Sequence, residues 1–404
     1  MLFQLAWRNI WRNHHRSLIT MASIASAVML AVVTVALQKG VFDNLVENLV
    51  GMYSGHIQVH SEGYWEEQVL DNAFLLTDSM LSGVAAVAGV EAVSPRLETF
   101  SLLSMDEKTK GALVVGILPD REDGLTGLGY KLMSGVLPEV SASSVLLGEG
   151  LAERIQAGVG DTVVLLGQGY FGSMAAGKFP VAGLLHFGSP ALNDQVVYLP
   201  LPAAQHWLDA PGMATTLAVR VSAGSDLSAV AQQLGLVARE GWEVLTWEEM
   251  MPEIVQHIRT DNAGMLIMLG VLYLLIAFGI FSTLLMMLAE RQREFGMLVA
   301  LGMKQRAIAA VLVMESVLLT LGGCLVGVLL SLPVTWYLTV HPIRFEGEFA
   351  EIYEQFGFEA VFPAVMEPGI FLRQAVFVLA LGLLLSAYPV WRVLKLDPVE
   401  AMRR

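Results

Sequence analysis

Residues 263–289 read AGMLIMLGVLYLLIAFGIFSTLLMMLA, an apolar stretch without a charged residue. At a rise of about 1.5 Å per residue, a helix of this length crosses the roughly 30 Å hydrocarbon core of a bilayer. Stretches 17–38, 307–339 and 369–391 have the same character, and their only charged residues are Glu315 and Arg373. The sequence therefore predicts a polytopic α-helical membrane protein with four transmembrane helices.

The composition agrees with a chain that lies partly in lipid. Of its 404 residues, 55% are hydrophobic and 15% are charged, whereas soluble domains carry about 25% charged residues. The net charge of −14 excludes a general nucleic-acid binder, which needs a basic face. A single cysteine, Cys324, excludes an intrachain disulfide.

The first apolar stretch has two interpretations, a cleaved signal peptide or a retained membrane anchor. Its uncharged core exceeds the 7–15 residues usual for a signal peptide, and no small-residue cleavage site follows it. We expect a retained first transmembrane helix at 17–38.

Charge predicts the orientation in the membrane. Segments 1–16, 290–306 and 392–404 together hold eleven Lys and Arg against four Asp and Glu. The segments on the opposite side, 39–262 and 340–368, are strongly acidic. Because cytoplasmic loops carry the excess of Lys and Arg, we expect both termini in the cytoplasm of a multi-pass protein of the bacterial inner membrane.

Residues 39–262 between the first two spans predict a large mixed α/β extracytoplasmic domain. Short apolar runs, broken by glycine and proline, indicate strands; they lie at 56–60, 111–116, 161–166, 179–183 and 216–221. Helices are expected at 149–157 and at 227–236, the second with Asp226 as its N-cap.

This domain carries little catalytic chemistry in its sequence. His56 and His60 would lie roughly 13 Å apart on a strand, too far for one metal ion, and no HExxH or GxSxG motif occurs. Binding is the more plausible role. Trp65, Trp207, Trp242 and Trp247 offer apolar area. The glycine-rich run 168–174, with Tyr170, Phe171 and Met174, is either a hairpin tip that contacts a partner or substrate or an ordinary hairpin with a buried aromatic residue.

The loop at 290–306 is too charged to enter lipid and too apolar to be a simple turn. We expect a short helix along the membrane surface that offers Phe295, Leu298 and Leu301 to a partner. In the tail 392–404, Asp397 as N-cap, Pro398 at N1 and Glu400 at N3 indicate the start of a C-terminal docking helix.

These two segments carry a family resemblance. Residues 290–302 resemble the coupling-loop pattern E-R-x-R-E-x-G-x-x-x-A-L-G, and Tyr388, Pro389, Arg392, Pro398, Ala401 and Arg403 resemble the tail pattern Y-P-x-x-R…P-x-x-A-x-R. Residues 145–163 resemble a MacB-like periplasmic core, and 1–16 resemble the family's amphipathic N-terminal helix. The chain is similar over its whole length to ABC transporter permeases of the LolC/LolE, MacB and FtsX family.

The resemblance implies roles for these residues. The coupling segment is expected to contact an ATPase through nine residues: Glu290, Arg291, Arg293, Glu294, Phe295, Gly296, Leu298, Leu301 and Gly302. The C-terminal helix is expected to dock through Asp397, Pro398, Glu400, Ala401 and Arg403. The expected partners are two copies of a cytoplasmic ABC ATPase, a second permease (identical or paralogous), membrane lipids and a periplasmic carrier or adaptor.

The resemblance also implies that this chain binds no cofactor and that ATP and Mg²⁺ enter through the partner ATPase. The sequence agrees, since it has no G-x-x-x-x-G-K-[ST] phosphate loop. We therefore expect a permease subunit, not an enzyme.

Two features inside the spans suggest helix packing. Gly323, Gly327 and Ser331 recur every four residues, which lets another helix approach closely, either within the chain or from a second permease. Glu315 is costly in lipid and is expected either to bond within the bundle or to pair near the ATPase-facing end. The extracytoplasmic loop 340–368 has an apolar helical face at Phe349, Ile352, Tyr353 and Phe356.

Three functions follow from the resemblance. The first is ATP-driven mechanotransmission that extracts lipoproteins or other lipidated or amphiphilic substrates from the outer leaflet. The second is MacB-like export of a small molecule or peptide with an adaptor. The third is FtsX-like signalling to a cell-wall hydrolase without transport.

Overall fold

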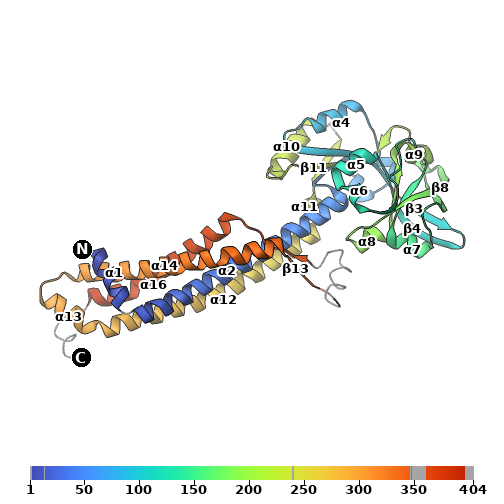
Figure 1. Cartoon of the computed structure of the whole chain (residues 1–404). Coiled ribbons are helices and arrows are strands. Elements are labelled where there is room, and N and C mark those ends of the chain that lie inside the picture. Colours follow the sequence, from blue (N-terminus) through green and yellow to red (C-terminus); the bar gives the residue numbers. More distant parts are fainter. Residues whose placement is uncertain (1, 13, 239–240, 346, 348–360, 396–404) are drawn as a thin grey trace. The chain divides into compact units, whose positions relative to one another are not determined.

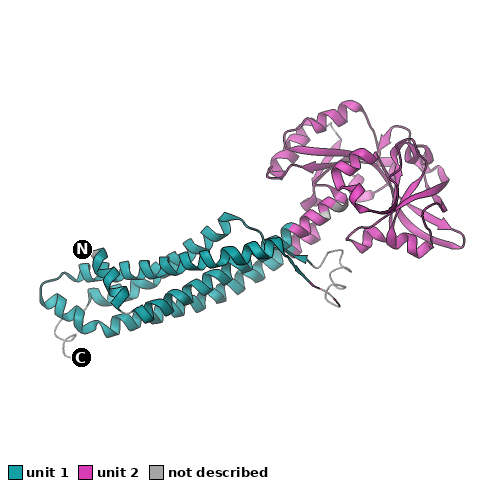
Figure 2. Ribbon diagram, in the orientation of Figure 1, with its two compact units in different colours: residues 1–43, 258–344, 361–404 teal, residues 44–257, 345–360 magenta. Residues whose placement is uncertain are grey.

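The computed structural model describes all residues except 1, 13, 239–240, 346, 348–360 and 396–404 (Figure 1). The chain divides into two compact units (Figure 2). The first contains residues 1–43, 258–344 and 361–404, and the second contains residues 44–257 and 345–360.

The first unit is a bundle of long helices. They are α2 (His14–Leu49), α12 (Pro252–Glu290), α14 (Gln305–Val340) and α16 (Pro368–Leu394). Among the described residues these four helices are long and apolar enough to span a bilayer, which agrees with the four predicted spans. At most 33% of the residues in the most apolar window of each helix are buried, so each offers a wide apolar face to lipid or to another helix.

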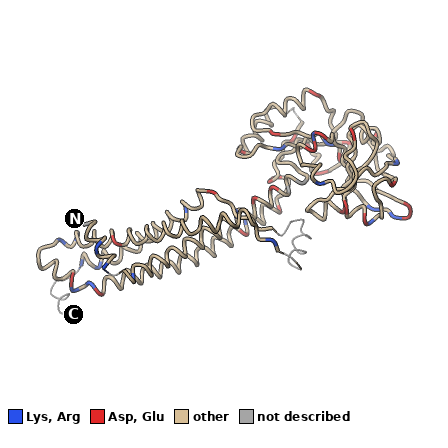
Figure 3. The backbone as a smooth tube through the Cα atoms, in the orientation of Figure 1, with Lys and Arg blue, Asp and Glu red and all other residues tan. Residues whose placement is uncertain are grey.

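Short elements complete this unit. Helix α1 (Leu2–Arg12) precedes α2, and α13 (Gln292–Ala300) joins α12 to α14. Strands β13 (Ile343–Arg344) and β14 (Val361–Phe362) pair antiparallel. The middles of the long helices have few charged residues, and the charged residues lie mostly toward the helix ends (Figure 3).

The small residues of α14 set how closely two helices of the bundle approach. A Cβ on Gly323 would lie 2.7 Å from Ile24 Cβ, and one on Gly327 would lie 2.7 Å from the Ala25 carbonyl oxygen. Both contacts are with α2 of the same chain. Gly323 and Gly327 therefore pack within the chain, while an approach of a second permease along the stripe that also includes Ser331 stays a prediction.

The second unit is the predicted mixed α/β domain. Its main sheet has the order β12-β1-β11-β3-β4-β9-β6-β8-β5, and β7 pairs with β3 and β8. Most neighbours are antiparallel, whereas β4–β9 and β6–β8 are parallel. The strands are β1 (Ile57–Ser61), β3 (Val90–Met105), β4 (Lys108–Ile117), β5 (Leu132–Gly135), β6 (Val145–Gly148), β7 (Thr162–Gln168), β8 (Met174–Leu185), β9 (Val196–Pro200), β11 (Thr216–Val221) and β12 (Trp242–Thr246).

Helices and short segments cover this sheet. The longer ones are α4 (Asp78–Ala85), α5 (Pro119–Thr126), α7 (Glu149–Ile155), α9 (Leu201–Trp207) and α10 (Leu227–Val237). The shorter ones are α3 (Tyr64–Glu67), α6 (Leu128–Lys131), α8 (Pro190–Asn193), α11 (Trp247–Met250) and the 3₁₀ helices η2 (Leu70–Asn72) and η3 (Tyr170–Gly172). A second sheet pairs β2 (Phe74–Leu75) with β10 (Met213–Ala214).

The predicted strands and helices of this domain are confirmed, including the Asp226 cap, whose side chain accepts a hydrogen bond from the Ser228 amide. Two tryptophans were predicted wrongly as binding surface. Trp207 and Trp247 are buried, because burying a large aromatic ring removes much apolar area from water.

The helices extend beyond the predicted spans. The domain was expected at 39–262, yet α2 continues to Leu49 and α12 begins at Pro252, so the compact unit starts at residue 44 and ends its main segment at 257. Charged residues such as Lys39 and Asp261 mark where each apolar stretch ends. The helical backbone hydrogen bonds continue past these residues, so the helix is longer than the apolar stretch.

Candidate functional site

The candidate site is the short helix α13 and the residues that hold it in the bundle. The helix begins after Arg291 and ends at Ala300, and two residues further on Gly302 has a φ of +96°, in the left-handed region. The amides of Gly302 and Met303 donate to the carbonyls of Val299 and Leu298, which satisfies the last carbonyls of the helix. Glycine at this position lets the chain turn sharply into α14.

One face of α13 packs inward. Phe295 is only 2% exposed and lies in an apolar cluster contributed by α12, α13, α14 and α16. Its other buried members are Leu288, Ile308, Ala309, Leu312 and Val393. The opposite face is open, with Met297 and Leu298 exposed and Leu301, just past the helix end, 80% exposed.

A buried ion pair joins Arg291, the residue just before α13, to α14. Arg291 Nη1 donates to both carboxylate oxygens of Glu315 at 2.8 and 2.9 Å, and the two side chains are 11% and 2% exposed. The guanidinium carbon of Arg291 also lies 5.0 Å from the centre of the Phe295 ring, a cation–π distance. Glu315 therefore pairs inside the helical unit with a residue of the segment between α12 and α14, and a role toward an ATPase stays a prediction.

Exposed ion pairs tie the N-terminal segment to the same region. Arg12 of α1 donates to both oxygens of Glu294 at 2.9 Å, and Arg16 of α2 pairs with Glu290 at the end of α12. Although partial burial opposes it, hydrogen bonds from Arg12 and Arg291 hold the pKa of Glu294 below its usual value. Because Arg291 contacts Glu294 and Glu315, the ionic contacts link four helices around α13.

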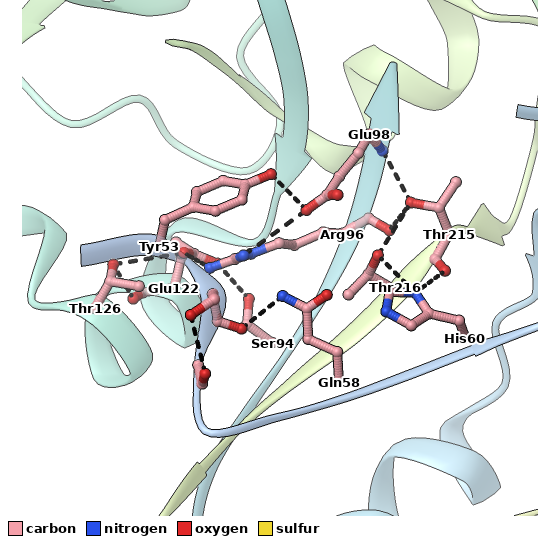
Figure 4. Close-up of polar contacts among 12 residues, drawn as sticks. Tyr53, Gln58, His60, Ser94, Arg96, Glu98, Glu122, Thr126, Thr215 and Thr216 are labelled. Atoms are coloured by element: carbon pink, nitrogen blue, oxygen red, sulfur yellow. Dashed lines mark hydrogen bonds and ion pairs between the residues drawn. The ribbon is translucent and has the colours of Figure 1, made fainter. Parts of the chain in front are cut away.

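A second polar cluster lies inside the outer domain, around Arg96 of β3 (Figure 4). Arg96 Nε and Nη2 donate to Glu122 of α5 at 3.1 and 2.6 Å, and both side chains are fully buried. Ser94 donates to the same carboxylate at 2.8 Å. On the other side of Arg96, the Tyr53 hydroxyl donates to Glu98 at 2.7 Å.

The electrostatics of this cluster follow from burial. Although burial opposes its charge, Glu122 holds the pKa of Arg96 above its usual value, so the guanidinium stays charged. Burial raises the pKa of Tyr53 and of Glu98. Sequence analysis missed this cluster, although Ser94, Arg96 and Glu98 alternate along a strand and so fall on one face of it, which was the available signal.

Two family models match the chain. The FtsX-like permease C-terminal model matches residues 266–398, and the MacB-like periplasmic core domain model matches residues 17–236, more than half of the chain. The chain belongs to the MacB–FtsX family of ABC transporter permeases.

Individual relatives of the permease are distant. It is 25% identical over 408 aligned residues to the lipoprotein-releasing system transmembrane protein LolC of Xylella fastidiosa, with 97% of this chain and 95% of that protein covered. It is 26% identical over 160 residues to an uncharacterized ABC transporter permease of Methanocaldococcus jannaschii, with 38% and 40% covered. The periplasmic region of MacB from Actinobacillus actinomycetemcomitans is 18% identical, with 53% and 97% covered and a TM-score of 0.37.

The structure of the permease brings together most of the predicted coupling residues. Glu290, Arg291, Glu294 and Gly296 lie in or beside the cluster of ion pairs and apolar contacts. One expected position is wrong, because Phe295 was placed among the residues offered to a partner and is instead internal. Its ring fills the space between α12, α14 and α16, whereas Leu298 and Leu301 remain exposed on the outer face.

The remaining predicted sites of the permease have different outcomes. The run 168–174 is the tip of the β7–β8 hairpin, where Phe171 and Met174 are exposed and Tyr170 packs on the domain core. The expected tail helix, with Asp397, Pro398, Glu400, Ala401 and Arg403, lies outside the described residues. So does the apolar helical face expected within 340–368, at Phe349, Ile352, Tyr353 and Phe356.

Proposed function

We propose that this permease is a subunit of an ATP-driven transporter that works by mechanotransmission. A separate cytoplasmic ATPase, present in two copies, binds ATP and Mg²⁺ and changes shape, and two permease chains pass that movement to their outer domains. Both termini and α13 lie on the cytoplasmic side in this proposal, as the excess of Lys and Arg there indicates.

The observation that carries the proposal is the linkage of α13 to the bundle. The Arg291–Glu315 pair and the apolar cluster around Phe295 fix one face of α13 to α12, α14 and α16. A displacement of α13 therefore cannot be absorbed locally and is passed to the long helices. The open face, with Met297, Leu298 and Leu301, is left for the ATPase.

The proposed substrates are lipoproteins or other lipidated or amphiphilic molecules in the outer leaflet. The support is the likeness over nearly the whole chain to a protein named for lipoprotein release, together with long helices whose apolar faces remain open to lipid. In this proposal the exposed hairpin residues Phe171 and Met174 contact a periplasmic carrier that receives the substrate, and Tyr170 holds the hairpin on the domain.

Two other functions keep the same mechanics. They are MacB-like export of a small molecule or peptide with an adaptor and FtsX-like signalling to a cell-wall hydrolase, and both agree with the two matching family models. The neighbouring genes distinguish them, because a carrier, an adaptor or a hydrolase would be encoded beside the ATPase.

The coupling role is tested by a charge placed on the open face. Leu301→Asp is expected to abolish co-purification of the ATPase and ATP-dependent release of lipoproteins from membranes, because an apolar contact would have to bury a carboxylate. Leu236→Asp, at an exposed leucine of α10 in the outer domain, is the matched control and is expected to keep ATPase binding.

Two results would contradict the proposal. One is wild-type ATPase binding and release by the Leu301→Asp chain. The other is ATP hydrolysis by the purified permease alone, which would place the nucleotide site in this polypeptide.

A further inference from the structure

The outer domain is connected to the bundle helices by two chain segments that meet at adjacent strands. Helix α2 ends in a π-helical turn, η1 (Val50–Ser54), which leads into β1, and β12 leads through α11 into α12. Strands β1 and β12 pair antiparallel with Ile57 opposite Thr246, and the Trp247 amide donates to the His56 carbonyl at 3.0 Å. Both connections therefore leave the domain at the same end of one strand pair.

The connection from α2 is held by side chains from three different elements. The Tyr53 hydroxyl donates to Glu98 of β3, and the Arg96 guanidinium lies 4.6 Å from the centre of the Tyr53 ring. Lys131 at the end of α6 donates to the Gly51 carbonyl at 3.1 Å. Gln58 of β1 donates to the Ser54 carbonyl at 2.7 Å.

These contacts meet the structural need of a helix end. The last carbonyls of a helix have no partner within it, and a π turn displaces them further from regular pairing. Lys131 supplies a cation to one of these carbonyls and also donates to the Thr126 carbonyl at the end of α5 at 2.7 Å. It thus fastens the end of α2 to α5, which Arg96 in turn fastens to β3 through Glu122.

Stability alone does not account for this cluster. A buried ion pair contributes little net stability compared with apolar residues of the same volume. Arg96 Nη1 lies 3.7 Å from Glu98 Oε1, an ion pair longer than a hydrogen bond, so this buried atom is compensated only in part. What the cluster does provide is a fixed position for Tyr53, because the directional bonds of Glu98 and Arg96 allow one placement of its ring and hydroxyl.

The connection to α12 is held by a different kind of contact. Thr246 and Glu249 form a capping box over four residues of α11, and Trp247 and Met250 are buried. These are short-range contacts next to the segment itself, whereas the contacts of η1 reach β3, α5 and α6.

We infer that Tyr53, Lys131, Arg96, Glu98 and Glu122 form an anchor through which the first membrane helix drives the outer domain. This inference rests on the proposed mechanotransmission and assigns its force-bearing connection to η1. The anchor residues are positioning residues, since they contact no substrate. With the anchor intact, residues 44–54 and the domain move as one body, and without it α2 moves while the domain lags behind.

The test measures the distance between two spin labels within the outer domain, in the complex with the ATPase. Labels are placed by Glu47→Cys, near the end of α2, and Lys110→Cys, at an exposed position of β4, in a Cys324→Ser background and diluted with unlabelled chain. The disrupting variants are Tyr53→Phe and Tyr53→Phe with Lys131→Met. The matched control is Tyr64→Phe, which removes the hydroxyl of a buried tyrosine on α3 beside β1.

The wild type and Tyr64→Phe are expected to give one narrow distance, the same with and without ATP. In the double variant, ATP is expected to broaden the distribution or add a second distance, because losing a hydrogen bond to a charged group shifts an equilibrium by roughly tenfold. ATP hydrolysis should continue while lipoprotein release falls by about the same factor. Tyr53→Phe alone is expected to give the same broadening of the distance distribution, but a smaller one. If the double variant does not accumulate in the membrane, the single variant tests the anchor.

A narrow, ATP-independent distance in the Tyr53→Phe chain together with wild-type release would overturn the anchor. Failure of the proposed function gives a different result. In that case the wild-type complex hydrolyses ATP but releases no lipoprotein, while the label distances still report whether η1 is fastened to the domain.

Discussion

At the scale of single residues, Arg291 is central to the candidate coupling site, because it contacts three of its side chains. It pairs with the buried Glu315, contacts the exposed Glu294 and lies over the Phe295 ring. A buried carboxylate without its partner is costly, whereas an exposed ion pair contributes little. Two ion pairs of the same site should therefore respond very differently to mutation.

We predict that Arg291→Met lowers the free energy of unfolding by about 3–5 kcal/mol, because Glu315 is left buried and unpaired. Arg291→Met combined with Glu315→Leu should recover most of this loss. Arg12→Gln, at the exposed pair with Glu294, is the control and should cost about 1 kcal/mol or less. Urea unfolding in detergent measures all three, and equal effects of Arg291→Met and Arg12→Gln would contradict the buried pair.

His60 gives the outer domain a predicted pH dependence. It is fully buried, its Nδ1 lies 3.2 Å from the Thr215 carbonyl, and burial lowers its pKa from 6.5 to about 4. The unfolded chain therefore takes up a proton as the pH falls below 6.5, while the folded domain does not. Stability is complete above pH 6.5 and declines as the pH falls toward 4.

We expect a loss of about 2 kcal/mol at pH 5 relative to pH 7 from this histidine. Thermal unfolding of the full chain at both pH values measures it, and His60→Gln should reduce the difference. His56, whose pKa burial also lowers, would leave a smaller dependence of the same sign. An unchanged pH dependence in His60→Gln would show that His60 is not the group responsible.

At the scale of elements, the close approach of α14 to α2 depends on glycine. A Cβ at Gly327 would lie 2.7 Å from a backbone oxygen and 2.8 Å from Val28 Cβ, so one of the helices would have to move. At Gly322 the nearest atom is the terminal carbon of Met21 at 2.6 Å, which can rotate away. Two glycines five residues apart in one helix thus differ in whether they can be replaced by alanine.

We predict that Gly327→Ala destabilises the bundle by about 1–3 kcal/mol through overpacking, and that Gly322→Ala has a much smaller effect. Unfolding in detergent compares the two, with cross-linking to follow the oligomeric state. If Gly327→Ala changed only the association of two permeases and not the stability of one, the stripe would instead belong to an interface between chains.

At the scale of the whole molecule, the proposed function has α13 and the outer domain on opposite sides of the membrane. We predict that Lys110→Cys reacts with an impermeant maleimide in intact spheroplasts, while Leu301→Cys reacts only after the membrane is opened. The two positions are exposed, and the native Cys324 is buried, so access decides the labelling. Labelling of Leu301→Cys in intact spheroplasts would reverse the proposed orientation.

Much of the fold could be predicted from the sequence. The four long helices, the α/β domain between the first two, and the short helix at 292–300 were all expected from contiguous residues. The ends of α2 and α12 could not be placed, since hydropathy reports where lipid ends and not where a helix ends. The inward orientation of Phe295 was missed, because a short amphipathic segment does not reveal which of its sides meets the bundle.

The sequence by itself determined what depends on neighbouring residues: the length of each apolar stretch and the charge of each segment. Only the tertiary structure decided which distant residues meet. Arg291 reaches Glu315, 24 residues further along the chain, Gly327 faces Ala25, and Tyr53 bonds to Glu98 across the outer domain. Such pairs depend on how each helix or strand is rotated and placed when apolar surfaces pack, and no local pattern encodes that placement.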